Sequence, residues 1–104
     1  MILTTCDTVP GREIDSTLGL CRGSAIRARH IGKDILAGLK NLVGGEMHEY
    51  SKLLAETREQ ALDRMVEDAR TQGADAVVAI RYASTAISQG AAEFLAYGTA
   101  VKLA

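Results

Sequence analysis

The chain has 104 residues, a formal net charge of −1 and 47% hydrophobic residues, with one Phe, three Tyr and no Trp. This length predicts a single domain over residues 1–104 that buries about two-thirds of its unfolded surface. The charge gives no reason to expect nucleic acid or an anionic membrane as a partner. No apolar run approaches the roughly 20 residues of a membrane span, and the N-terminus lacks the features of a signal peptide, so we expect a cytoplasmic protein.

The first part of the chain reads as strands separated by turns. Ile2 to Cys6 is expected to form a short strand that ends at Val9-Pro10-Gly11, where proline and glycine favour a turn. Arg12 to Ala28 is expected to be extended, with strand-like parts on both sides of Gly23. Ile31 to Val43 has apolar residues at helical spacing, which predicts a first, shorter helix ending at two glycines.

A long amphipathic helix is the strongest local prediction. It should run from about Glu46 to Gln72 and end at Gly73, which supplies the left-handed residue that helix ends favour. At 100° per residue the acidic and basic side chains gather on one side. The apolar residues gather on the other side: Tyr50, Leu54, Ala61, Leu62, Met65, Val66 and Ala69.

Two further strands follow the long helix. Ala74 to Tyr82 is rich in small and β-branched residues, with Val78, Ile80 and Tyr82 expected on one face. After a connection containing Ser88-Gln89-Gly90, Ala92 to Leu103 alternates between two faces. One face carries Leu95, Tyr97, Thr99, Val101 and Leu103, and the other carries Phe94, Ala96, Gly98 and Ala100. The order of elements predicts an α+β fold, with an antiparallel sheet covered on one face by the long helix.

The two cysteines are most simply free thiols. In a reducing cytoplasm, Cys6 and Cys21 would behave as small apolar residues. A disulfide between them requires their strands to pair closely, and this alternative stays open at the level of sequence.

His30 and Asp34 form the first candidate metal site. They are four residues apart, so they would share a face if the first helix begins by His30. A histidine and a carboxylate can coordinate a divalent ion, and a histidine oriented by a carboxylate can act as a base. The structural alternative is that Asp34 caps the helix or forms a salt bridge while His30 packs at a subunit contact.

Glu46, His48 and Glu49 form a second polar cluster at the start of the long helix. Glu46 and His48 are candidate metal ligands. The carboxylates have another explanation, because acids at a helix N-terminus interact favourably with the macrodipole, by about 0.3–1 kcal/mol each.

Arg58 is exceptional because its position falls inside the apolar arc of the long helix. A guanidinium there is costly unless its donors are paired. We therefore expect Arg58 to be partly buried, with a carboxylate or backbone carbonyl of the same chain or of a neighbouring subunit as its partner.

The chain lacks a recognisable catalytic motif, phosphate loop or dinucleotide-binding fingerprint, so we expect a protein that is not an enzyme. Its charges are unevenly distributed. Arg22 to Lys33 holds four Lys or Arg residues plus a histidine and no acid, whereas Glu46 to Asp68 holds seven of the thirteen acids. These are either two solvated faces or two segments that meet across a subunit boundary. The basic segment lacks aromatic residues for stacking on nucleic acid bases.

Seven segments in chain order resemble the YbjQ family of small prokaryotic proteins labelled as heavy-metal-binding. They are Thr8-Val9-Pro10-Gly11, Gly23-Ser24, Arg29-His30-Ile31-Gly32-Lys33-Asp34-Ile35, Val43-Gly44-Gly45-Glu46, the helix positions Tyr50, Leu54 and Ala61, Gly73-Ala74-Asp75-Ala76-Val77-Val78, and Tyr97-Gly98-Thr99-Ala100-Val101.

The resemblance implies a dodecin-like β-α-β-β subunit with an additional shorter helix, which assembles with itself into a ring of five. It also implies a metal ion as ligand, although Cys6 and Cys21 stand where the family has ordinary small or apolar residues and inherit no ligand role. We therefore expect a cytoplasmic homopentameric binding protein with a divalent metal ion as its ligand. The alternative is a non-catalytic scaffold that binds a protein or a small anion through Arg22 to Lys33.

Overall fold

The computed structural model describes residues 1–27, 45–88 and 91–104, with side chains described over 1–26, 52–86 and 92–104. The predicted helix over Ile31 to Val43 lies outside the described residues, as do Gln89 and Gly90 of the predicted connection. The described chain forms four strands and the helix α2 (Gly45–Thr71). The strands are β1 (Ile2–Leu3), β2 (Ile14–Arg27), β3 (Ala76–Ser88) and β4 (Ala91–Leu103).

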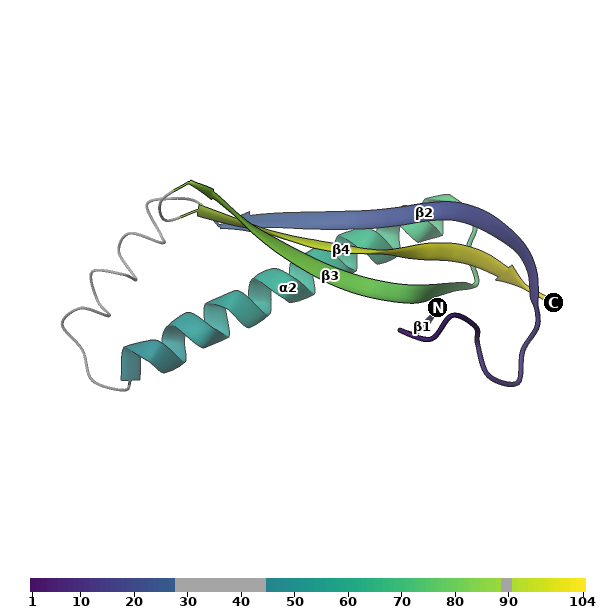
Figure 1. The fold of residues 1–104 in the computed structure, drawn as a ribbon, viewed down its shortest axis with the longest axis horizontal. Coiled ribbons are helices and arrows are strands. Elements are labelled where there is room, and N and C mark those ends of the chain that lie inside the picture. The colour runs from purple at the N-terminus through teal and green to yellow at the C-terminus, as the bar shows by residue number, and fades with distance from the viewer. Residues whose placement is uncertain (28–44, 89–90) are drawn as a thin grey trace.

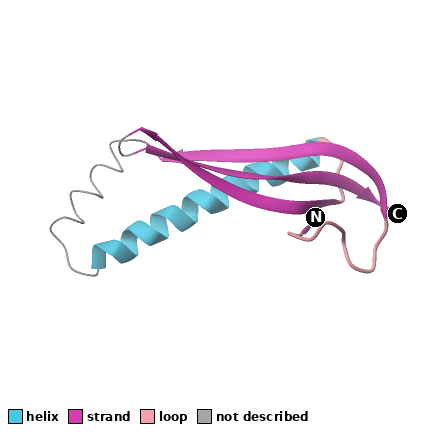
Figure 2. Cartoon of the chain, viewed as in Figure 1, coloured by secondary structure: helices cyan, strands magenta, loops and turns pink. Residues whose placement is uncertain are grey.

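One sheet, in the order β1-β3-β4-β2, forms a layer that α2 crosses on one side (Figures 1 and 2). β4 pairs antiparallel with both β2 and β3, and β1 adds to the far edge of β3 in parallel. The predicted α+β architecture is confirmed, as is the long helix, within one residue at each end. β2 is a single strand that continues through Gly23, whereas the sequence pattern predicts two strand-like parts there.

The main core lies between α2 and the sheet. Its helix side consists of Ala61, Met65 and Ala69, all fully buried, and small residues of β2 and β4 face them. Gly23 brings the two layers into backbone contact, because a Cβ there would lie 2.2 Å from the amide nitrogen of Met65 and 2.5 Å from the carbonyl oxygen of Ala61. Small residues therefore allow a core with few aromatic side chains to be dense.

A smaller core lies on the opposite face of the sheet, near the chain termini. It contains Val9, Ala76, Val78 and Val101, with Val9 contributed by the segment between β1 and β2. That segment turns at Pro10 and Gly11, where Gly11 has φ +80° and the N–H of Arg12 donates to the carbonyl of Val9 at 3.0 Å. The predicted turn is confirmed, and it holds Val9 against the sheet.

A bulge in β3 contradicts the predicted faces of that strand. Ala79 has φ +54°, and the pairing with β4 shifts between Val78 and Arg81. Because the extra residue reverses the alternation, Val78 packs in the smaller core while Ile80 packs under α2. The prediction that Val78, Ile80 and Tyr82 share one face is therefore wrong. The alternation predicted for β4 is confirmed by the same two clusters, which separate Ala96 and Ala100 from Val101.

Candidate functional site

The predicted metal ligands fall at the margin of what the structure describes. His30 and Asp34 lie outside the described residues, and Glu46 and His48 lie in the first turn of α2 with their side chains undescribed. Within the described part of the chain, no three His, Cys, Asp or Glu side chains converge to hold a metal ion. The four candidates therefore stay predictions.

Both cysteines are free, as predicted, and they occupy different environments. Cys6 is exposed beside β3, whereas Cys21 is fully buried in the main core, with its thiol 3.6 Å from the carbonyl oxygen of Gly98. Burial, and secondarily the negative charge of Asp68, raises the pKa of the Cys21 thiol. Cys21 is therefore a neutral core residue, unsuited to bind a metal as a thiolate.

Arg58 is exposed, and its side chain has no hydrogen bond or ion pair with any described residue. The prediction of partial burial is therefore wrong, and the described residues include no partner for its guanidinium. The apolar arc shows which side of the helix faces the core, but a side chain on that side is buried only where another layer of the fold lies opposite it. α2 diverges from the sheet toward its N-terminus (Figure 1), and among the helix side chains that the structure describes the fully buried positions end at Thr57. A contact between Arg58 and another subunit stays a prediction.

α2 closes the outer edge of β2 with a ladder of side chains. Arg64 donates to the carbonyl of Ser24, Asp68 accepts the N–H of Arg22 at 2.9 Å, and Gln72 donates to the carbonyl of Leu20 at 3.0 Å. Four helical residues rise about 6 Å and two strand residues about 6.6 Å, so the two sets stay in register.

The outer edge of β3 is different. The N-terminal segment covers it as far as Ile80, whose N–H donates to Thr4. Beyond Ile80, no backbone hydrogen bond among the described residues reaches this edge, and the sequence from Tyr82 to Ser88 carries no charge and no proline. Within the described chain, one edge of the sheet is therefore protected against strand addition, and the other is uncovered beyond Ile80.

The most distinctive surface is the sheet face opposite α2, beyond the smaller core. We define this uncovered face by its residues on three strands: Leu20, Arg22, Ser24 and Ile26; Glu93, Leu95, Tyr97 and Thr99; Arg81, Ala83 and Thr85. Leu20 is 60% exposed and Ile26 is 58% exposed, which is high for large aliphatic side chains on a regular strand.

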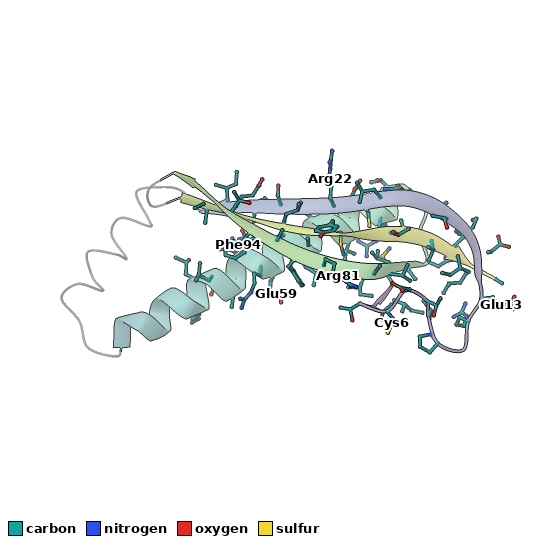
Figure 3. The ribbon with its side chains drawn as sticks, viewed as in Figure 1. Cys6, Glu13, Arg22, Glu59, Arg81 and Phe94 are labelled. Carbon is teal, nitrogen blue, oxygen red and sulfur yellow. The ribbon has the colours of Figure 1, made fainter. Side chains whose placement is uncertain are left out.

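The register places Tyr97 of the central strand directly between Arg22 and Arg81 of its neighbours on the uncovered face. Arg81 is held at the edge of the sheet, where its guanidinium donates to the carbonyls of Thr5 and Ile80. Arg22 projects from β2 (Figure 3), and its side chain has no partner among the described residues. The row could not be read from the sequence, because it depends on a register that the bulges in β2 and β3 change.

The solvent side of α2 carries the exposed acids Glu56, Glu59, Asp63 and Glu67. Only Glu67 forms an ion pair with another described residue, at 2.9 Å from Arg70. No helix of the described chain is long and apolar enough to cross a membrane.

Comparison with known proteins gives a consistent result. A family model named YbjQ, described as “Putative heavy-metal-binding”, matches residues 1–104. A protein of Methanosarcina acetivorans named “UPF0145 protein” is 59% identical over 99% of this chain and 97% of its own length. A protein of the same name from Archaeoglobus fulgidus is 54% identical over 99% of this chain and 95% of its own length.

The fold also matches a solved structure. A protein of unknown function of the DUF74 family from Pediococcus pentosaceus has a TM-score of 0.67 with 12% identity, over 100% of this chain and 98% of that one. At this identity the likeness shows the fold alone. The family model and the full-length relatives agree with the resemblance in the sequence, and the chain belongs to the YbjQ family.

Proposed function

We propose that the protein is a non-catalytic, cytoplasmic homo-oligomer that binds a divalent metal ion. The observation that carries the assembly is the extended shape of a subunit with an apolar sheet face uncovered. The radius of gyration is 16.9 Å, against about 13 Å for a compact domain of this length. The accessible surface is 6501 Å², whereas a compact monomer of 11.1 kDa exposes about 5,700 Å².

The excess of roughly 800 Å² is close to the area that one partner buries in a standard protein interface. The resemblance to the family supports five copies in a ring. In such a ring a single donor from each chain would recur around the axis, so that His30 or His48, with Asp34 or Glu46, could contribute to shared sites. This repetition would make a binding site from residues that are weak ligands in one chain.

A second candidate keeps the assembly and replaces the metal ion with a protein or a small anion at the basic segment from Arg22 to Lys33. The observation that favours it is the exposed Arg22 guanidinium, which has no partner among the described side chains. Capture that weakens as salt increases, without a bound metal, would support this candidate.

Native mass spectrometry of protein purified without chelators tests the leading proposal, because it reports subunit number and bound metal together. We expect five copies of 11.1 kDa, about 55 kDa, with additional mass from metal. Calorimetric titration of His30→Ala and His48→Ala then assigns the ligands: at least one variant should lose metal binding while keeping the oligomer. A monomer would overturn the assembly, and unchanged titrations would remove both histidines.

A further inference from the structure

We propose that copies of this chain associate head to tail, with the uncovered sheet face of one copy packed on a flank of α2 of the next. This inference rests on the proposed assembly and names the surfaces that form it. We define the α2 flank by Leu62 and Val66 together with Arg58, Glu59 and Asp63. Arg58, Leu62 and Val66 follow one another at intervals of four residues, as do Glu59 and Asp63, so all five line one side of the helix, beside the part that faces the sheet.

The α2 flank is open because the helix lies off-centre on its own sheet. α2 packs mainly on β2, less on β4, and touches β3 little. Leu62 and Val66 contact the main core with part of their surface and stay half-exposed on the side toward β3. Each subunit therefore presents two different incompletely buried apolar surfaces, the uncovered face and the α2 flank.

The apolar parts of the two surfaces favour contact with each other. Leu20 and Ile26 are more than half exposed, and Leu95 and Tyr97 lie half-buried between them on the central strand. Removing apolar area from water stabilises a contact by about 25 cal/mol per Å² before the costs of association. Leu62 and Val66 are half-exposed aliphatic side chains in the part of α2 that packs on the sheet, so they are available for contact with this face.

Each of the two surfaces carries a basic and an acidic side chain. The uncovered face carries Arg22 and, on the central strand, Glu93; the α2 flank carries Glu59 and Arg58. None of these four side chains has an ion pair or hydrogen bond with another described side chain. Arg22 of one copy can pair with Glu59 of the next, and Glu93 with Arg58. Arg58 then gains across the interface the partner that no described residue of its own chain supplies.

The contact cannot form within one copy. Figure 3 places Arg22 and Glu59 on opposite sides of the subunit. Because the two surfaces differ and every chain carries both, the contact repeats from copy to copy. Such head-to-tail contacts close into a ring when the rotation allows it and otherwise extend as a filament.

A charge swap in the full chain tests this pairing. Arg22→Glu places like charges against Glu59 of the next copy, and Glu59→Arg does the same from the other side. Each single variant should raise the dissociation constant of the oligomer by about tenfold or more, measured by sedimentation over a dilution series. The double variant restores opposite charges at every contact and should return to within about threefold of the unmodified protein.

Two further variants separate the pairing from general effects. Glu13→Arg reverses an exposed charge outside both surfaces and should leave the dissociation constant unchanged. Leu20→Ser removes an exposed aliphatic side chain, so it should weaken association while the melting profile of the dissociated subunit keeps its shape. If the unmodified protein assembles and neither Arg22→Glu nor Leu20→Ser weakens it, the proposed surfaces are wrong and the oligomer stands. A monomeric unmodified protein would overturn both proposals.

Discussion

The contact between Gly23 and α2 predicts a large effect from a single added methyl group. Gly23 does not need the left-handed conformation, so its requirement is one of space. In Gly23→Ala, the new Cβ would lie 2.2 Å from the Met65 nitrogen, where ordinary contact begins at 3.4 Å. The helix backbone would have to withdraw by the difference, 1.2 Å, because no flexible side chain can move instead.

The magnitude follows from two contributions. Overpacking of a core typically costs about 1–3 kcal/mol. Withdrawal of α2 also stretches the three hydrogen bonds from Arg64, Asp68 and Gln72 to β2, each of which contributes about 0.5–1.5 kcal/mol when well formed. We expect Gly23→Ala to lower the free energy of unfolding by about 3 kcal/mol, which corresponds to a fall in Tm of about 15 °C for a domain of this size.

Gly11→Ala is the matched control, because Gly11 has φ +80° and a Cβ there would meet nothing within 4 Å. Gly11→Ala should lower the free energy of unfolding only by the cost of the left-handed conformation, about 1–2 kcal/mol. Urea unfolding followed by circular dichroism, at one protein concentration for all variants, measures the free energy of unfolding of both variants. If Gly23→Ala costs no more than Gly11→Ala, the backbone contact between β2 and α2 is not as described.

Four other predictions concern single groups. A thiol reagent should modify Cys6 rapidly and Cys21 only after unfolding, and fast modification of both would contradict the burial of Cys21. Because burial raises the Cys21 pKa above its ordinary 9.0, its contribution to stability should be lost as pH rises through the folded value; Cys21→Ala should flatten that alkaline decline. The N–H of Leu103 lowers the Asp75 pKa below its ordinary 3.8, so stability from this group is present above pH 3.8 and is lost as pH falls through the folded value; an acid titration of the urea midpoint should be shallower for Asp75→Asn. Ala79→Gly removes left-handed strain of about 1–2 kcal/mol and increases unfolded-chain entropy by somewhat less, so it should raise the urea midpoint slightly; a lower midpoint would show that Ala79 is not strained.

Elements with a sustained local pattern could be predicted from the sequence. Apolar spacing followed by Gly73 located α2 to within a residue at each end, and the alternation from Ala92 to Leu103 assigned both faces of β4. These patterns are local, since each depends on the repeat of one element.

The wrong predictions concern residues whose conformation or burial depends on a neighbouring strand or layer. The bulge at Ala79 reversed the faces of β3, and nothing in the residue type marks it, because alanine rarely takes a positive φ. The sequence predicts an interruption between two strand-like parts at Gly23, whereas Gly23 is the point where α2 touches β2. Arg58 lies in the apolar arc of the helix and is nevertheless exposed.

For the candidate sites too, spacing within one element can be read from the sequence, whereas contacts between elements cannot. The spacing of Arg64, Asp68 and Gln72 at four-residue intervals is visible in the sequence, but their partners on the edge of β2 depend on how the two elements pack. The row of Arg22, Tyr97 and Arg81 depends on strand register. His30 and Asp34 lie outside the described residues, so the structure adds no geometry to that prediction.

The central claim is that this extended subunit completes its core by associating with copies of itself. Native mass spectrometry of the unmodified protein, at micromolar concentration and without chelators, tests it most directly. We predict a single assembly of about 55 kDa, five times the 11.1 kDa of one chain. A spectrum that contains only the 11.1 kDa species would contradict the claim.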